Sequence, residues 1–181
     1  MTRADSLEIP YHDHPRVRRL QAVIRYCLED LSLSFDNWES PGHKGPGAYI
    51  AVVSGWSVAS YADAMGDNRW PDHGRDVLAD IDAFYDAARR VTDTCDGAVV
   101  VGVDGVVNEQ LVRFRSNDDL DVEYEPWMGA RHMSALDISI REDVVATLTL
   151  SQENGRVSVF ENGTFESERP ETFASEWRTD A

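Results

Sequence analysis

Apolar residues recur at intervals of three and four along two segments of the chain. In the first segment they begin after Pro15 and form one helical stripe: Val17, Leu20, Ile24, Cys27, Leu28 and Leu31. This spacing predicts an amphipathic helix with the proline in its first turn. A second helix is predicted from a similar stripe: Val77, Leu78, Ile81, Phe84, Tyr85, Ala88 and Val91. Each helix should bury one face against the rest of the protein.

The remaining apolar segments are typical of β-strands. Residues 48–60 hold two β-rich runs around Gly55, and we expect a hairpin there, followed by a loop over 61–74. Residues 97–114 are interrupted by Asp104-Gly105, a dipeptide that favours tight hairpin turns. After these we expect a loop and short helix over 127–139 and strands over 144–151, 156–160 and 164–167. Without regular βαβ spacing, this order predicts an α/β fold: a single domain with a mixed central β-sheet flanked by helices.

The charge of the chain is unusual. It has 17 basic and 33 acidic residues, a formal net charge of −16, and Lys44 is its only lysine. Self-repulsion at this charge destabilises a compact state at low salt, and molar salt screens it because the Debye length falls to about 3 Å. The composition therefore favours a protein of a high-salt cytoplasm, such as that of a halophilic archaeon. An ordinary acidic soluble protein remains the alternative.

The same features bear on partners and location. A chain this acidic is not expected to bind nucleic acid non-specifically, because that requires a basic surface. The sequence contains no run of about 18 apolar residues that could span a membrane, and residues 1–15 lack a signal-peptide pattern. A cytoplasmic location is therefore expected. Cys27 and Cys95 lack metal-site spacing and are expected to be buried thiols, with a disulfide as the alternative.

Two short stretches could carry chemistry. Asp96-Gly97-Ala98 lies between the second predicted helix and a buried strand, where an aspartate can be either a turn residue or a functional carboxylate. Gly129-Ala130-Arg131-His132 opens the short helix. Free N–H groups at a helix N-terminus and a neighbouring arginine suit a phosphate group. A surface Arg–Asp pair with a packed histidine would explain the second stretch equally well.

Taken together, these stretches place the segment 47–166 close to a known family. It resembles the diadenylate cyclase domain, the catalytic module of cyclic di-AMP synthases. That family has an Asp-Gly-Ala motif, matched at 96–98, and an Arg-His-Arg motif, matched at 131–133 by Arg-His-Met. A family strand ending Ser-Glu-Glu, with a glycine turn and an Ile-Ser-Val strand, is matched at 151–159, and an upstream strand is matched at 47–50.

Three positions depart from the family pattern. The family's second arginine is Met133 here, a residue that is often threonine is Ala130, and the first glutamate of the pair is Gln152. The methionine removes one charge from the expected phosphate site. A non-catalytic sensor of the same fold, which binds ATP or cyclic di-AMP without turnover, is therefore the alternative function. An unrelated interaction domain with an acidic surface is a third.

The resemblance implies a nucleotidyltransferase that condenses two ATP into cyclic di-AMP and releases two pyrophosphates. It implies a homo-oligomer, at least a face-to-face dimer, and a divalent metal, Mn²⁺ or Mg²⁺. Asp96 would be catalytic and a metal ligand, with Glu153 as a second ligand. The nucleotide-binding residues would be Asp96, Gly97, Ala98, Gly129, Ala130, Arg131, His132, Met133 and Ser151. The organisation would be an N-terminal helical extension and loop (1–46), a catalytic domain (47–168) and a flexible tail (169–181).

Overall fold

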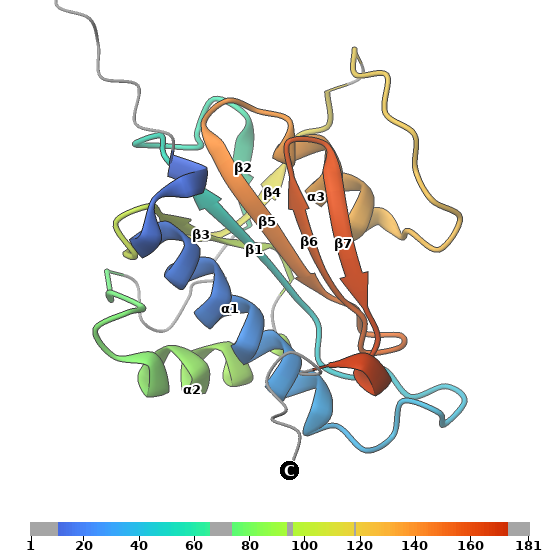
Figure 1. Cartoon of the computed structure of the whole chain (residues 1–181). Coiled ribbons are helices and arrows are strands. Elements are labelled where there is room, and N and C mark those ends of the chain that lie inside the picture. The colour runs from blue at the N-terminus through green and yellow to red at the C-terminus, as the bar shows by residue number, and fades with distance from the viewer. Residues whose placement is uncertain (1–10, 66–73, 94–95, 118, 174–181) are drawn as a thin grey trace, which may run out of the picture.

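The fold is a mixed sheet with helices on both faces (Figure 1). A computed structural model describes residues 11–65, 74–93, 96–117 and 119–173. Within these ranges the strands are β1 (Ala48–Val53), β2 (Ala62–Ala64), β3 (Ala98–Gly102), β4 (Val107–Phe114), β5 (Val144–Leu150), β6 (Val157–Glu161) and β7 (Thr164–Glu168). The helices are α1 (Pro15–Leu33), α2 (Ile81–Thr92) and α3 (Ala130–Ser139), with 3₁₀ turns at Tyr11–Asp13 and Pro170–Thr172. The strand order is β2-β4-β3-β1-β5-β6-β7.

Strand directions decide where the ends of the strands meet. β1 is parallel to β3 and antiparallel to β5, and the other neighbouring pairs are antiparallel. The predicted mixed sheet and α/β class are confirmed. The beginnings of β1 and β3 and the end of β5 consequently lie at one edge of the sheet.

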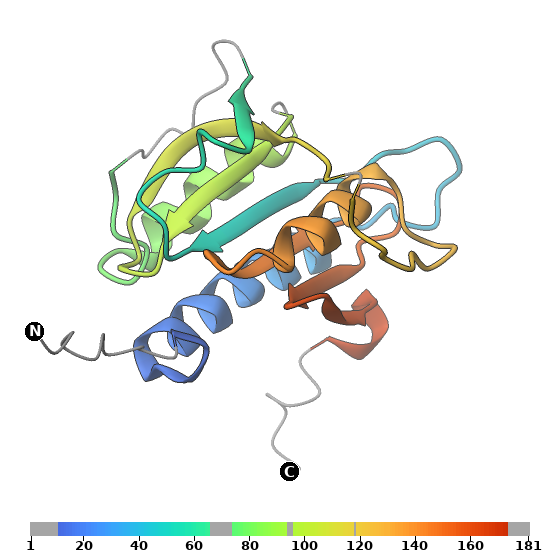
Figure 2. The same cartoon turned by 90° about the horizontal axis from the view of Figure 1, so that it is seen from above.

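Two apolar clusters, one on each face of the sheet, form the core. α1 and α2 cover one face and α3 covers the other (Figure 2). In α1, Leu20, Ile24 and Leu28 are fully buried in the same cluster as Leu148 of β5. Burial of each such side chain contributes roughly 1.5–3 kcal/mol. The N-terminal helix therefore packs into the same core as the sheet.

The end of the described chain is packed as well. Of the tail expected over 169–181, residues 170–172 form a 3₁₀ turn, and Phe173 is buried in the cluster beneath α1. A buried aromatic ring holds this segment against the domain. Residues 170–173 of the expected tail therefore pack against the domain, and residues 174–181 lie outside the described part.

The hairpin expected over residues 48–60 is wrong. β1 ends at Val53, and both of its edges are hydrogen-bonded, to β3 and β5, which come from distant parts of the chain. No edge is left for a strand that follows directly. Val58 is buried within the connecting loop. The chain resumes strand structure at β2, in a segment expected to be loop, because β4 offers a free edge there.

The second helix begins later than its apolar stripe suggests. Asp80 is its N-cap and accepts a hydrogen bond from the Ala83 amide (3.0 Å). Val77 is buried in the turn before it, next to the bridge between Asp76 and Val106. The apolar stripe therefore includes residues that are buried in the turn before the helix as well as residues of the helix itself.

Local turn signals were more reliable. Gly105 has a φ of +90° in the β3–β4 hairpin, and Asn162 and Gly163 have φ values of 47° and 77° in the β6–β7 hairpin. Both dipeptides thus form the predicted turns, which need left-handed backbone. Cys27 is a buried free thiol as expected, whereas Cys95 lies outside the described residues. None of the described helices combines the length and apolarity that crossing a bilayer requires.

The stability of this acidic fold should depend on salt. Several ion pairs are exposed, such as Arg115–Asp63 at 2.7 Å and Arg18–Asp13 at 2.9 Å, and such pairs each contribute little. We expect repulsion from the net charge of −16 to outweigh them at low salt. We expect the melting temperature to rise as KCl increases from about 0.1 M to about 1 M, because the Debye length falls from about 10 Å to about 3 Å. Circular dichroism melts would measure this, with an uncharged osmolyte as the control. A flat salt series would contradict the high-salt interpretation.

Candidate functional site

The two predicted motifs meet at the edge where β1 and β3 begin and β5 ends. Asp96 lies just before β3, and Arg131 lies in the first turn of α3. Their side chains approach to 3.7 Å between Arg131 Nη2 and Asp96 Oδ1. The Asp96 side chain is 81% exposed and that of Arg131 only 23%. A solvent-facing carboxylate is thus paired with a largely buried guanidinium.

The Arg131 side chain is hydrogen-bonded to the sheet. Its Nη1 donates to the Leu150 carbonyl at the end of β5 (3.4 Å). Gly47 leaves room for it, because a Cβ there would overlap the Gln152 side chain and lie 2.5 Å from Arg131 Nη1. Burial lowers the pKa of Arg131, and the Asp96 carboxylate opposes that shift. Arginine nevertheless stays protonated. The site therefore holds a fixed, partly desolvated positive charge.

Gly97 is required by the backbone. Its φ is +104°, and a Cβ would lie 2.8 Å from the Met65 sulfur and 3.1 Å from the Val112 carbonyl oxygen. Only glycine adopts this conformation without strain in such a space. Ala98 is fully buried in the cluster on the α3 face. The glycine thus turns the chain from the exposed Asp96 into the core.

The N-terminus of α3 is open to solvent. Its N-cap is Gly129, which has extended backbone (φ −87°, ψ −177°) and provides no side-chain cap. A Cβ on Gly129 would meet nothing within 4 Å, and Ala130 is exposed. The first amides of a helix carry partial positive charge and attract anions. Arg131 and this helix end therefore form one positive region.

His132 faces inward beside that region. It is 7% exposed, its ring lies 5.1 Å from the Trp127 ring, and its Nε2 has no hydrogen-bond partner among the described residues. Burial, followed by the charges of Arg131 and Arg156, lowers the pKa of His132 to about 4. It is therefore neutral at pH 7. Met133 is half-buried and packs against the same apolar cluster.

The depressed pKa makes the stability of the protein depend on His132 below neutrality. Between about 4 in the folded state and 6.5 in the unfolded state, the unfolded chain binds the extra proton. We expect neutral His132 to make its full contribution to the free energy of unfolding above pH 6.5, and this contribution to be lost as the pH falls towards 4. Urea unfolding of the wild type and of His132→Gln across that range would measure it. Equal pH slopes for the two proteins would contradict the prediction.

Ser151 and Glu153 lie in the turn after β5. Ser151 is buried, and its Oγ accepts a hydrogen bond from the Glu153 amide (3.3 Å). The Glu153 carboxylate is exposed and makes no ion pair with another described residue. Within the described ranges, no three His, Cys, Asp or Glu side chains are grouped as a metal site. Mg²⁺ is commonly held by one or two carboxylates together with substrate phosphates, and the exposed Asp96 fits that arrangement.

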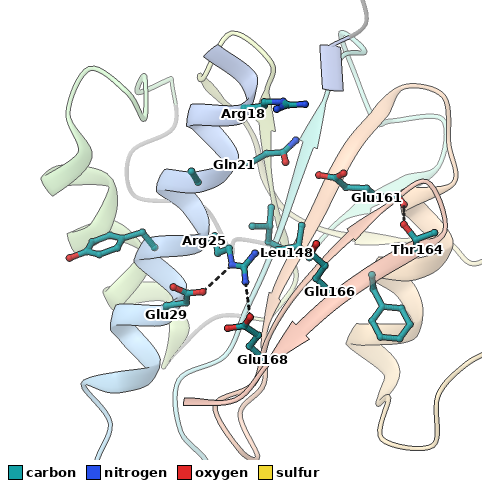
Figure 3. Close-up of a pocket in the computed structure, with 13 residues that line it drawn as sticks. Arg18, Gln21, Arg25, Glu29, Leu148, Glu161, Thr164, Glu166 and Glu168 are labelled. Atoms are coloured by element: carbon teal, nitrogen blue, oxygen red, sulfur yellow. Dashed lines mark hydrogen bonds and ion pairs between the residues drawn. The ribbon is translucent and has the colours of Figure 1, made fainter. Parts of the chain in front are cut away.

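A cavity near the beginnings of β1 and β3 is too small for a nucleotide. Gly47, Gly97, Val99 and Leu111 help to line a cavity of about 20 Å³. This is room for about one water, so an adenine ring would need the site to open or would lie outside it. A much larger cavity of about 590 Å³ lies on the face of the sheet that α1 and α2 cover, between α1 and β6–β7 (Figure 3).

The larger cavity is lined by side chains that connect α1 to the outer strands of the sheet. Arg25 of α1 lines it and pairs with Glu29 at 3.0 Å and with Glu168 of β7 at 3.8 Å (Figure 3). Its Nη1 also donates to Glu166 of β7 at 3.3 Å. These contacts connect the helix to the outer strand of the sheet. The residues of the predicted motifs lie on the other face and at its edge. Cavity size alone is therefore a poor guide to the functional site here.

Comparisons with known proteins address the fold and the domain. Residues 81–165 match the family model DAC, described as DisA bacterial checkpoint controller nucleotide-binding. The chain is similar to the solved structure of a hypothetical membrane spanning protein from Bacillus cereus, with a TM-score of 0.57 and 18% identity over 81% of this chain and 62% of that one. It is also similar to a double mutant of DacA from Staphylococcus aureus, with a TM-score of 0.55 and 18% identity over 88% of this chain and 96% of that one.

These similarities differ in extent. The chain spans less than two thirds of the length of the Bacillus cereus protein. No curated protein sequence matches it. The comparisons confirm the predicted fold, and the family match confirms the resemblance that the motifs at 96–98 and 131–133 suggested.

Proposed function

We propose that this chain, which carries a diadenylate cyclase domain over residues 81–165, condenses two ATP into cyclic di-AMP and releases two pyrophosphates. The observation that carries the proposal is the pair formed by Asp96 and Arg131. An exposed carboxylate lies 3.7 Å from a largely buried arginine at the open N-terminus of a helix. This arrangement suits a nucleotide whose phosphates face the helix and whose ribose faces the carboxylate.

Each half of the reaction forms one P–O bond and breaks another. A ribose 3′-oxygen attacks an α-phosphate, its proton is released, and pyrophosphate leaves in line with the attack. Arg131 and the first amides of α3 would hold the triphosphate and neutralise charge on the leaving group. Neutral His132 can donate or accept a hydrogen bond but adds no charge. Met133, half-buried against the apolar cluster, contributes packing.

A bound Mn²⁺ or Mg²⁺, held by Asp96 with Glu153 as the proposed second ligand, would neutralise phosphate charge and ease deprotonation of the 3′-hydroxyl. The exposed position of Asp96 leaves it accessible to a nucleotide presented from outside the chain. Its side chain is 81% exposed. Asp96 would therefore orient the incoming 3′-hydroxyl.

The active form would be a homo-oligomer of at least two chains meeting face to face. The product is two-fold symmetric, so each 3′-hydroxyl must reach the α-phosphate of the other ATP. A site at an open edge of one chain suits this geometry. We also propose that the protein works in a high-salt cytoplasm, because of its net charge of −16.

A non-catalytic sensor of ATP or cyclic di-AMP is the second candidate function. Met133 favours it, because the position that carries an arginine in the resembled family is here half-buried in an apolar cluster. Incubation with ATP and Mn²⁺ in concentrated KCl, followed by mass analysis, separates the two. Cyclic di-AMP with two pyrophosphates per molecule supports the cyclase. ATP binding without product supports the sensor, and absence of both contradicts the two proposals together.

A further inference from the structure

Arg156 lies beside the candidate site although it belongs to neither of the two motifs. The β5–β6 register pairs Leu150 with Val157, so Ser151 and Arg156 are opposite each other at the next position. The Ser151 amide donates to the Arg156 carbonyl (2.9 Å). Ser151 was expected to contact the nucleotide from the resemblance alone. The sheet therefore places an arginine next to it.

The Arg156 side chain lies on the same face of the sheet as α3. Alternate residues of β6 share a face, and Phe160 packs in the cluster beneath α3. Arg156 precedes it by four positions. Its Nη1 contacts Ser167 Oγ of β7 on that face (3.1 Å). Arg131 reaches the same area from the first turn of α3, where it contacts the Leu150 carbonyl.

An aromatic ring connects Arg156 to the helix end. The Arg156 guanidinium lies 4.3 Å from the centre of the Trp127 ring, and that ring lies 5.1 Å from the ring of His132. Stacking of this kind fixes the plane of an arginine and leaves its edge free for hydrogen bonds. Burial, and then the charges of Arg131 and Arg156, lower the pKa of His132, so both arginines lie near it.

Three buried polar atoms in this area lack hydrogen-bond partners among the described residues. They are His132 Nε2, Arg156 Nε and Thr149 Oγ1. Thr149 is paired with Ser158 across β5 and β6, two positions before the Ser151–Arg156 pair and on the same face of the sheet. The three unpaired atoms therefore belong to one region. Buried polar atoms normally have partners, because an unsatisfied one is costly. His132 is only 7% exposed, so its free nitrogen points to a ligand rather than to bulk water.

The charge of the ligand can be inferred from the same residues. An ATP triphosphate carries several negative charges, and this chain has a net charge of −16, so anion binding depends on local cations. Arg131 is partly neutralised by Asp96. Arg156 makes no ion pair with a described residue, and Arg169 lies close enough to lower its pKa further after burial. The free positive charge of this region is therefore on the Arg156 side.

We propose that Arg156 is a second phosphate-binding arginine of this site. It binds the outer phosphates of ATP, and then the departing pyrophosphate, next to His132 and Arg131. The inference rests on the proposed function, because it assigns a contact to the same nucleotide. It adds a residue outside the motifs and specifies the chemical group that this residue recognises, a pyrophosphate moiety.

Binding measurements on matched variants test the proposal. Calorimetric titrations with pyrophosphate, ATP and AMP at fixed KCl would compare the wild type with Arg156→Gln and Arg156→Lys. Arg141→Gln is the control, because Arg141 also stacks on an aromatic ring, that of Tyr61 at 3.6 Å, and its replacement removes the same charge. We expect Arg156→Gln to weaken pyrophosphate and ATP binding by about 10- to 100-fold and AMP binding hardly at all. Arg156→Lys should be intermediate, because it keeps the charge and loses the planar fork.

Each other outcome contradicts a defined part of the proposal. Unchanged pyrophosphate affinity in Arg156→Gln, or an equal loss for AMP, would overturn the role of Arg156 and leave the cyclase proposal intact. A wild-type protein that binds neither ATP nor pyrophosphate would overturn both.

If Arg156→Gln does not fold, the wild type still decides the question. The Nε–H resonance of Arg156, assigned by its absence from the spectrum of Arg156→Lys, should shift when pyrophosphate is added. No shift at saturating pyrophosphate would overturn the proposal.

Discussion

Replacing Asp96 with asparagine is expected to reduce cyclic di-AMP formation by about 10²- to 10⁴-fold, the range typical of a lost acid–base or metal-positioning group. Asparagine keeps the size of the side chain but removes the negative charge that would hold the metal and orient the 3′-hydroxyl. The fold should be unaffected, because the Asp96 side chain is 81% exposed and its ion pair with Arg131 is loose at 3.7 Å. Initial rates of product formation, with a thermal melt of each protein, would measure both effects.

Asp93→Asn is a suitable control for this substitution. Asp93 is exposed, lies three positions before Asp96 at the end of α2, and carries the same charge. Its replacement should leave the rate within about twofold, because a single exposed charge has a small effect at high ionic strength. Wild-type turnover in Asp96→Asn would remove Asp96 from the mechanism. An equal loss in Asp93→Asn would indicate a general effect of charge.

Arg131→Ala is expected to lower kcat/KM for ATP by at least about 100-fold, as loss of a preorganised donor to developing negative charge does elsewhere. Arg131 is the buried cation at the helix end, and its contacts with the Leu150 carbonyl and Asp96 fix its direction. Loss of the guanidinium removes a charge-assisted contact with the triphosphate in both the ground state and the transition state. Steady-state kinetics over a range of ATP concentrations would separate the effect on KM from that on kcat.

Arg131→Lys and Arg18→Ala complete this experiment. Lysine keeps the charge without the planar fork, so it should restore part of the activity. Arg18 pairs with Asp13 at the start of α1, which covers the face of the sheet opposite α3, and loss of Arg18 should leave kinetics unchanged. Full activity of Arg131→Ala would show that the helix amides and the metal hold the phosphates without it.

The sequence predicted the elements that depend on local signals. The 3.6-residue period of α1, the turn dipeptides at Asp104-Gly105 and Asn162-Gly163, and the strands β5 to β7 were all found where expected. Each signal acts over a few residues, through backbone conformation or the burial of one face. The second helix was misjudged because buried Val77 lies in phase with the helical stripe, although Asp80 begins the helix after it.

The pairing of strands could not be predicted from such signals. β1 was expected to fold back on residues 55–60, yet it is the central strand, between β3 and β5. Hydrogen-bonding partners of a strand are selected by contacts between segments far apart in the chain, and the alternation along one strand does not specify them. The same limit explains why α1, expected to be an extension, is part of the core.

For the candidate site, the sequence by itself identified Asp96, Gly97 and Arg131 as residue types that suit nucleotide chemistry. Only the tertiary structure decided that Asp96 and Arg131 meet, and that Arg156 lies beside Ser151 and His132. The physical reason is that a motif specifies chemistry and local backbone, whereas register places side chains from different strands in one row. A shift of one residue in the β5–β6 register would turn Arg156 to the opposite face, away from Trp127 and His132, which come from a different part of the chain.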